Sequence, residues 1–395
     1  MNEELRNKYR SNIWKTFALH ALAGLTLFFG VVSIFYYQQY NLSYFQISII
    51  AGAGLLTTLL AEVPTGAFAD LYGRKKSISL GIMLVFIGLL IMTFTNRFEI
   101  FLVSSIVWGL GQAFISGAWE ALLFDSLKKI KREKDYLQIS TQQQSTSMIV
   151  MLISTLTSPY LFSINVKYPY YISSVAGLLF FLFTFTLFEP GAKRKNTFAM
   201  HIDQMKKGFK YSLSHKKLQW LFMFGIIMVM SNKLGRNLTG APFVIAKGFT
   251  VPQYGLITFV SMIIMIVLMN FSSKLEKWLK EWTYAVMFFA WIIVSYLAFF
   301  SKGLFFIGFS SLGGSFQYIL LLVVDSNMNN MLTKKLRATV ISIFSMVSSL
   351  IVGITLFIVG YITDKTSIMF IVFVMITFYV VAGSLLLIMK GSPHA

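Results

Sequence analysis

Long apolar segments recur along the whole chain of 395 residues, and each is about as long as the roughly 20 residues that a helix needs to cross a bilayer. Only 12% of the residues are charged, about half the share that is usual in soluble domains. We therefore predict an all-α integral membrane protein with twelve transmembrane helices. The expected spans are 15–37, 44–69, 76–95, 98–124, 139–162, 168–188, 218–246, 252–273, 282–300, 303–329, 338–361 and 366–389.

The first apolar segment follows several basic residues, as the apolar core of a secretion signal does. It is too long for such a core and no small-residue cleavage site follows it, so we expect a retained first helix. The chain has no cysteine, which excludes disulfides, thiol catalysis and thiolate metal sites. The sequence also shows no metal-ligand spacing, no nucleophile–base signature and no phosphate-binding motif of ATPases. We expect neither an enzyme nor a metal or cofactor site.

Basic residues are distributed unevenly over the expected loops. If the N-terminus is cytoplasmic, 27 of the 34 Lys and Arg residues fall on the cytoplasmic side, five fall outside and two lie within a span. Cytoplasmic loops of membrane proteins carry this excess of bases. We therefore predict cytoplasmic N- and C-termini in a multi-pass protein of the plasma membrane, here a bacterial inner membrane. The net charge of +19 would then meet anionic lipid headgroups rather than nucleic acid.

One polar, lysine-rich connection divides the spans into six and six. We predict an N-terminal six-helix bundle over 1–188, a cytoplasmic basic linker over 189–217 and a C-terminal six-helix bundle over 218–395. The segment NLSYFQIS (41–48), which opens the second span, is weakly similar to TVPQYGLI (250–257), which opens the eighth. Two repeated bundles are typical of transporters that bind their substrate near the middle of the membrane, between the halves.

An acid and three bases crowd the short break after the second span, in GAFADLYGRKKS (66–77). These residues match the pattern G-x-L-A-D-x-x-G-R-K/R-K/R, with Phe68 in place of the leucine, so the chain resembles the major facilitator superfamily. The segments SGAWEALLFDSLK (116–128) and RATVIS (337–342) are also similar to that family, the former to its bacterial efflux-type members. The resemblance implies the two-bundle fold of that family and a secondary transporter.

The same stretch is expected to form a tight turn that carries an ion pair. Gly66 would let two helices approach closely, Gly73 would permit a turn that a side chain would strain, and Arg74 would close over Asp70. In the family this loop and an acid at the end of the fourth span hold the two bundles together in the outward-open state. The resemblance thus implies a conformational latch formed by Gly66, Asp70, Gly73, Arg74, Lys75 and Asp125. The alternative is that the bases only orient the chain in the membrane.

Five ionisable residues lie inside expected spans, namely Glu62, Glu120, Lys233, Arg236 and Asp325. An unpaired charge costs roughly 2.5–3.5 kcal/mol at the middle of a membrane. These residues should therefore pair, lose their charge or face a wet cavity.

Polar residues at helical spacing accompany the acids of the N-terminal half. Gln112, Ser116 and Glu120 recur every four residues in the fourth span, and Gln144 belongs to a similar series in the fifth. Such stripes face protein or water. Because a charged carboxylate is unfavourable in hydrocarbon, we predict that Glu62 or Glu120 carries a coupled proton. The alternative is that these acids pair with bases of the C-terminal half or with an amide and only hold the bundle together.

Lys233 and Arg236 lie one turn apart in SNKLGRNLTGAP (231–242), where two glycines and a proline could loosen the helix. Two cations beside unwound backbone would suit a carboxylate or a phosphate group. Alternatively, they form salt bridges with Asp325 or with the acids of the N-terminal half. His20 is expected either to pack through hydrogen bonds or to titrate. The candidate substrate-binding residues are Lys233, Arg236, Asp325, His20, Gln112, Ser116 and Gln144.

Two positions depart from the pattern of the family. Ser105 stands where many proton-linked members carry an arginine, shortly before Gly109-Leu110-Gly111. In the fifth span, STLTSPYLFS (154–163) keeps the spacing of small residues and proline seen in antiporters but lacks their later glycines.

We predict a monomeric secondary transporter that works by alternating access and exports a small amphipathic drug, toxin or metabolite in exchange for protons. Its partners would be this small molecule, protons and the lipid bilayer, and it would need no cofactor besides the proton gradient. The alternative is a carrier of an organic anion that Lys233 and Arg236 bind. A sensor or scaffold that transports nothing, or a membrane enzyme acting on lipid, fits the latch pattern less well.

Overall fold

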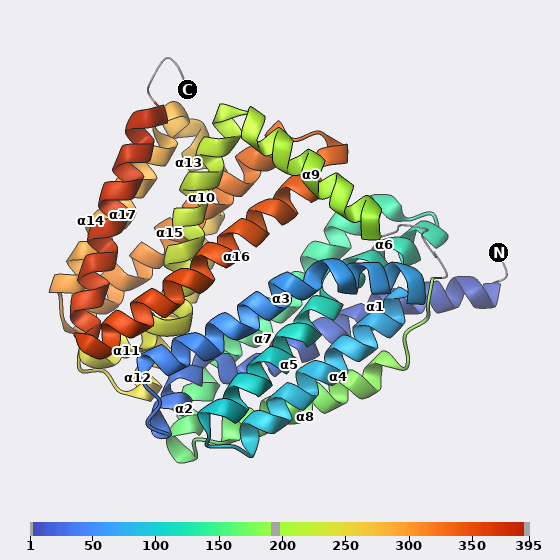
Figure 1. The fold of residues 1–395 in the computed structure, drawn as a ribbon, viewed down its shortest axis with the longest axis horizontal. Helices are drawn as coiled ribbons and strands as arrows, with labels where there is room; N and C mark the ends of the chain where they lie inside the picture. Colours follow the sequence, from blue (N-terminus) through green and yellow to red (C-terminus); the bar gives the residue numbers. More distant parts are fainter. Residues whose placement is uncertain (1–2, 191–197, 391–395) are drawn as a thin grey trace. The chain divides into compact units, whose positions relative to one another are not determined.

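The computed structural model describes residues 3–190 and 198–390. Within these ranges every regular element is a helix, as the composition predicts (Figure 1). The chain forms two compact units. Unit 1 comprises Met1–Leu42 and Ile49–Ile202, and unit 2 comprises Ser43–Ser48 and Asp203–Ala395.

The change from one unit to the other between Ile202 and Asp203 lies inside the expected linker, 189–217. The basic residues Lys193, Arg194 and Lys195 of that linker lie outside the described ranges. The part that follows is α9, Phe198–Ser214, in which Gly208 packs against Thr339 and Ile343 of α16.

Unit 1 contains the helices of the N-terminal half. They are α1 (Glu3–Thr26), the short helix η1 (Phe28–Val31), α2 (Ser33–Gln39), most of α3 (Tyr44–Tyr72), α4 (Arg74–Thr93), α5 (Phe98–Ile115), α6 (Ala118–Lys129), η2 (Glu133–Asp135), α7 (Tyr136–Ile164) and α8 (Tyr168–Thr184).

Unit 2 contains the helices of the C-terminal half. They are α10 (Lys216–Leu234), the π-helix η3 (Gly235–Thr239), α11 (Gly240–Ala246), α12 (Val251–Met269), α13 (Ser272–Leu279), η4 (Lys280–Trp282), α14 (Thr283–Phe300), α15 (Gly303–Met331), α16 (Lys334–Lys365) and α17 (Ile368–Lys390).

Ten segments of the described ranges are helical, long and apolar enough to cross a membrane. Of the other two expected spans, 168–188 contains the shorter apolar helix α8, and 15–37 is divided among α1, η1 and α2. At this division Ser158 Oγ of α7 donates a hydrogen bond of 2.8 Å to the carbonyl oxygen of Phe28. A spanning helix tolerates such a break when neighbouring helices satisfy the freed backbone groups.

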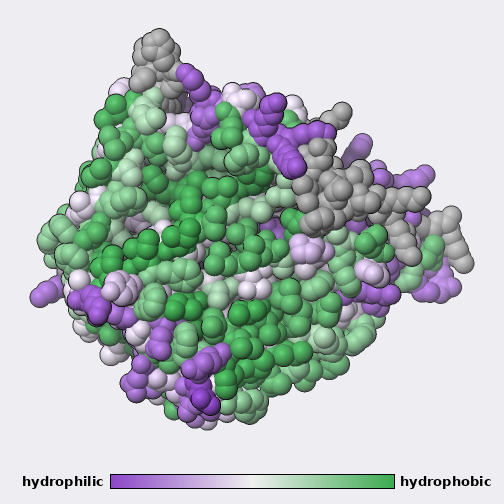
Figure 2. All heavy atoms as spheres, viewed as in Figure 1, coloured by the Kyte–Doolittle hydropathy of each residue, from purple (hydrophilic) through white to green (hydrophobic). Residues whose placement is uncertain are grey.

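Hydrophobic residues cover most of the face drawn in Figure 2, and hydrophilic residues gather where helices end. The exposed large apolar side chains include Leu304 and Phe305 of α15 and Ile388 of α17. A surface of this kind suits hydrocarbon, because exposed apolar patches of this extent are rare on soluble monomers.

Glycines permit close helix approaches in unit 1. Gly109 of α5 lies against the backbone of Gly54 in α3, and a Cβ at Gly111 would lie 2.6 Å from the carbonyl oxygen of Gly81 in α4. A Cβ at Gly66, in contrast, would meet no atom within 4 Å. The close helix contact expected at Gly66 is therefore wrong for this structure, and the Gly-x-Gly of the fourth span forms such contacts instead.

Hydroxyl groups connect the same helices. Thr58 and Thr65 of α3 donate hydrogen bonds to the carbonyl oxygens of Gly109 and Ala113, each at 2.9 Å. Ser105, which replaces the arginine of many family members, donates to the carbonyl oxygen of Ile50 at 2.7 Å. An arginine would not fit this contact, since Ser105 Oγ already lies 2.6 Å from where a Cβ on Gly54 would be.

The glycine contacts predict unequal effects of two similar substitutions. Gly111→Ala should lower the thermal midpoint of the purified protein by several degrees, because overpacking costs about 1–3 kcal/mol. Gly66→Ala is the matched control and should leave the midpoint unchanged or raise it, since alanine favours helix and finds open space there. Thermal unfolding in detergent checks both, and equal midpoints for the two variants would contradict the packing described.

Candidate functional site

A tight turn joins α3 to α4, and it brings the charged residues of the sequence motif together. Gly73 forms the turn with a φ of 109° and a ψ of 152°, a backbone conformation that residues with a side chain rarely adopt. Its carbonyl oxygen accepts the N–H of Ser77 at 3.2 Å, which begins α4. The expected turn at Gly73, which a side chain would strain, is confirmed.

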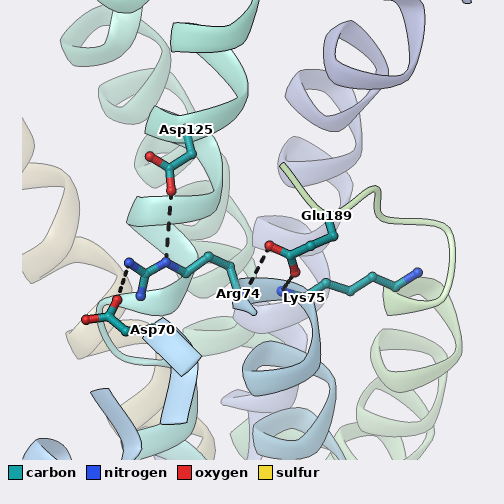
Figure 3. A network of polar contacts seen from close by, with 5 residues as sticks. All are labelled: Asp70, Arg74, Lys75, Asp125 and Glu189. Atoms are coloured by element: carbon teal, nitrogen blue, oxygen red, sulfur yellow. Dashed lines mark hydrogen bonds and ion pairs between the residues drawn. The ribbon is translucent and has the colours of Figure 1, made fainter. Parts of the chain in front are cut away.

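Arg74 points between two carboxylates (Figure 3). Its Nη2 lies 2.5 Å from Asp70 Oδ1 in the last turn of α3, and its Nε lies 4.0 Å from Asp125 Oδ2 on α6. The three side chains are only 7–9% exposed. Removing one partner of a buried ion pair is strongly unfavourable because it leaves an uncompensated charge in the interior. This cluster therefore ties α3, α4 and α6 together within unit 1.

Glu189 completes the cluster from the chain that follows α8. Its Oε1 and Oε2 accept the backbone N–H groups of Arg74 and Lys75 at 3.3 and 2.8 Å (Figure 3). A carboxylate at a helix N-terminus satisfies free N–H groups and interacts favourably with the helix dipole. Sequence reasoning missed this residue because 115 positions separate it from Arg74. The one signal in the sequence was its position, as an acidic residue directly after the sixth span.

Three side chains hold the segment that leads to Glu189. Lys75 Nζ donates to the carbonyl oxygen of Phe185 at 2.8 Å, and Lys15 Nζ donates to that of Thr186 at 2.6 Å. Asn12 forms a pair of hydrogen bonds with the backbone of Phe188, at 2.8 and 3.0 Å. Lys75 thus binds the end of the sixth span rather than an acid.

The predicted polar stripe on the fourth span is interrupted. Gly117 has a φ of 71°, so the helix ends at Ile115 and begins again at Ala118. Ser116 and Glu120 therefore do not continue the line of Gln112 along one unbroken helix, and the expectation of a single stripe is wrong. Ser116 and Glu120 are exposed and Gln112 is half-buried. Glu120 lies in the first turn of α6, where the helix dipole stabilises a negative charge.

His20 is hydrogen-bonded through both ring nitrogens. Nδ1 lies 2.7 Å from the carbonyl oxygen of Thr16, and Nε2 accepts the indole N–H of Trp119 at 3.1 Å. A neutral imidazole with its proton on Nδ1 satisfies both contacts. This geometry matches the packing alternative for His20.

Of two adjacent glutamines on α7, the structure buries the one that the spacing argument did not select. Gln144 is exposed, whereas Gln143 is 1% exposed and donates to Thr16 Oγ1 at 2.5 Å. Helical spacing alone could not show which of the two glutamines is buried, because it does not show which face of α7 packs against a neighbouring helix.

Glu62 is half-buried on α3, two turns before Asp70. No ion pair or hydrogen bond to its carboxylate is found among residues 3–190 and 198–390. Among the acids that the sequence places in spans of unit 1, it is thus the one without a helix-terminal position or a basic neighbour.

The cations of unit 2 lie beside irregular backbone, as the sequence predicts. Residues Gly235–Thr239 form the π-helix η3, which confirms the expected loosening near Pro242. π-Turns inside helices are frequent at functional sites. Lys233 Nζ of α10 donates to Ser349 Oγ of α16 at 3.1 Å, while Arg236 is exposed on the π-turn.

A salt bridge from Lys233 or Arg236 to Asp325, one of the open alternatives, is not formed within the described part of the chain. Asp325 is half-buried on α15. A pairing with Glu62 or Glu120 would join the two units and stays a prediction. The same described residues contain no cluster of three or more acidic or histidine side chains that could hold a metal ion.

The burial of the Arg74 cluster predicts that Arg74→Ala lowers the free energy of unfolding by about 3–5 kcal/mol, because two buried carboxylates lose their counterion. Arg132→Ala is a matched control, since its ion pair with Asp135 is 48% and 37% exposed and should contribute less than about 1 kcal/mol. Denaturant unfolding of the purified variants checks both values. A similar loss for the two variants would contradict the assigned burial.

Comparison with known proteins agrees with this geometry. The sequence profile described as Major Facilitator Superfamily matches residues 17–300. The MFS-type transporter YxaM of Bacillus subtilis (strain 168), itself uncharacterised, is 23% identical over 276 residues, which are 66% of this chain and 67% of that protein.

Solved structures match almost the whole chain. The crystal structure of the nucleoside transporter NupG has a TM-score of 0.75 at 14% identity and covers 99% of this chain and 100% of NupG. The D-xylose–proton symporter has a TM-score of 0.68 at 12% identity, covering 95% and 97%. At these identities the likeness shows the fold alone. Together with the profile match, it establishes that this chain belongs to the major facilitator superfamily and is a secondary transporter of that type.

Proposed function

We propose that this protein exports a small amphipathic molecule, such as a drug, toxin or metabolite, across the cell membrane in exchange for protons. It would work as a monomer by alternating access, with its two units opening the substrate site to one side of the membrane at a time. The observation that carries this proposal is the position of Glu62, a half-buried carboxyl in a spanning helix without a polar partner among the described residues.

Glu62 has the chemistry that proton coupling requires. A carboxylate in a dry part of the membrane is costly, whereas a protonated carboxyl is tolerated. A conformation in which Glu62 is dry would therefore take up a proton, and one in which it is wet would release it. A protein with the same fold, the D-xylose–proton symporter, couples transport to protons, and this supports the proposal. Glu120 is the second candidate, but its place at a helix N-terminus offers an alternative reason for its charge.

The Arg74 cluster would act as the conformational latch that holds the two units together in the outward-open state, as the family resemblance implies. In this proposal Gly73 and Glu189 fix the start of α4, so that Arg74 holds Asp70 and Asp125 in one arrangement. Gly66 and Lys75 belong to the same segment. A rigid end of unit 1 would let that unit move as one body. Export is supported by the resemblance of residues 116–128 to efflux-type members.

Proton coupling predicts that Glu62→Gln separates two activities. In proteoliposomes with an imposed pH gradient, movement of a cationic dye should fall at least about tenfold, while exchange of labelled for unlabelled dye without a gradient stays within about twofold. Exchange persists because it needs binding and alternation but no proton release.

Glu99→Gln is the matched control for this experiment, because Glu99 is exposed in an ion pair with Arg97 and should not affect either activity. Glu120→Gln tests the second carboxyl. Gradient-driven movement that survives in both Glu62→Gln and Glu120→Gln would refute the proton-coupling assignment. Loss in Glu120→Gln alone would transfer the role to Glu120.

A second candidate function is transport of an organic anion, and the surroundings of Lys233 and Arg236 favour it. Within unit 2 neither cation has an acidic partner among the described residues, and Lys233 bonds only to a neutral hydroxyl. Cations beside irregular backbone can bind a carboxylate or phosphate group.

If this candidate is correct, Lys233→Gln and Arg236→Gln should each weaken organic-anion uptake into proteoliposomes by about tenfold or more, since each removes a charge-assisted contact. Ser349→Ala is the control, because it keeps both cations and should change uptake by less than about threefold. Restoration of a Lys233→Asp variant by Asp325→Lys would indicate a structural ion pair and would overturn the anion site.

A further inference from the structure

Unit 2 contains a cavity of about 250 Å³ that is lined neither by the latch residues nor by the charged residues of the spans. It lies among α10, η3, α11, α14, α15 and α17. Its polar lining comes mainly from Ser231, Thr239, Ser295, Ser310, Gln317 and Tyr379. Glycines at Gly235, Gly313 and Gly314 leave the space open.

This cavity is separate from the cation site of unit 2. Ser231, Gly235 and Thr239 recur every four residues and line it, whereas Lys233 bonds to Ser349 on α16, a helix that contributes no lining residue. The lining contains no charged side chain. A charged molecule would therefore lose its hydration without gaining a counterion, and the occupant must be neutral.

The hydroxyl groups of the lining present acceptor sites to the cavity. Ser295 and Ser310 donate their protons to carbonyl oxygens of their own helices at 2.8 and 3.1 Å. Thr239 Oγ1 donates to the carbonyl oxygen of Leu234, the last residue of α10, at 3.4 Å. Because each hydroxyl has one proton, only the lone pairs of these oxygens remain for a molecule in the cavity. Such a surface favours an occupant that donates hydrogen bonds.

Tyr379 supplies a hydrogen-bond donor to the cavity. Its residue is 3% exposed, and its hydroxyl makes no hydrogen bond of normal geometry with a described residue, although Ser231 lies close enough to interact. A buried hydroxyl whose proton has no acceptor is unfavourable. A molecule with an oxygen or nitrogen acceptor, or a water, would remove this cost.

Aromatic rings form the apolar part of the wall. Trp291 and Tyr379 lie with ring centroids 5.6 Å apart, and Phe243 and Phe309 complete the lining. Aromatic faces favour a flat ring as their neighbour. The cavity is smaller than the roughly 300–1,000 Å³ of sites for drug-sized ligands, so it admits one ring rather than several.

We propose that this cavity is a binding site for a neutral, single-ring molecule that carries hydroxyl or amino groups. Its ring lies against Trp291 and Tyr379, its donors reach the serine and threonine oxygens, and one of its oxygens accepts from Tyr379. Because Gly235 and Thr239 of the π-turn line the site, occupancy stabilises the turn that carries Arg236. The proposal does not depend on proton coupling or on the direction of transport.

The test measures binding of resorcinol, a ring with two hydroxyl groups, to the purified full chain by calorimetry and by thermal shift. We expect saturable binding and a midpoint that rises with concentration, as linkage requires. 1,3-Dimethoxybenzene keeps the ring but lacks donors and should bind at least about tenfold more weakly, and benzoate should not bind. Absence of saturable resorcinol binding, or equal binding of the dimethoxy compound, would overturn the site.

Two variants locate the binding. Gly313→Leu fills the cavity, since a Cβ at Gly313 would lie 3.5 Å from Ser295 Oγ, and it should weaken resorcinol binding more than about tenfold. Gly308→Leu is the matched control on the same helix, because Gly308 is exposed and does not line the cavity.

Tyr379→Phe removes only the hydroxyl and should weaken binding about three- to tenfold, so it carries the test if Gly313→Leu fails to fold. Wild-type affinity in Tyr379→Phe, or equal loss in the two glycine variants, would place resorcinol elsewhere and refute the proposal.

Discussion

A polar group without a hydrogen-bond partner is costly in hydrocarbon, and this cost constrains both the helix interruptions and the buried charges of this structure. Spanning helices are interrupted after Thr26, at Gly117 and at the π-turn that begins at Gly235, and each interruption frees backbone groups. At the first, the hydroxyl of Ser158 on α7 donates a hydrogen bond to the freed carbonyl oxygen of Phe28. Around the second, hydroxyls of α3 and α4 reach the carbonyl oxygens of Ala113 and Phe114. At these two interruptions, neighbouring helices thus compensate for the irregular backbone.

The same cost makes the Arg74 cluster a cooperative unit. A guanidinium that is 9% exposed needs both nearby carboxylates, and its position depends on where α4 begins. Gly73 permits that beginning and Glu189 satisfies its N–H groups, while side chains of α1 and α4 hold the chain before Glu189. Loss of one member therefore affects groups from the first to the sixth span.

Much of this architecture could be predicted from sequence because its causes are local. Long apolar runs predict spanning helices, and the turn at Gly73 requires a residue without a side chain. Contacts between distant segments could not be predicted: no spacing rule connects Glu189 with Arg74, separates Gln143 from Gln144, or shows that Gly66 has open space around it. The helix break at Gly117 was missed because a periodic pattern of polar residues continued across it.

Alternation between two states of a two-unit transporter is the central claim, and it can be measured by electron spin resonance distances. The absence of cysteine allows labels to be attached at introduced cysteines alone. One pair would join Lys131 to Lys280 on the side expected to be cytoplasmic, and another Arg97 to Lys302 on the opposite side. We expect two distance populations for each pair, and acid and alkaline buffer should shift the two pairs in opposite directions. A single, unchanged distance for both pairs under all conditions would contradict it.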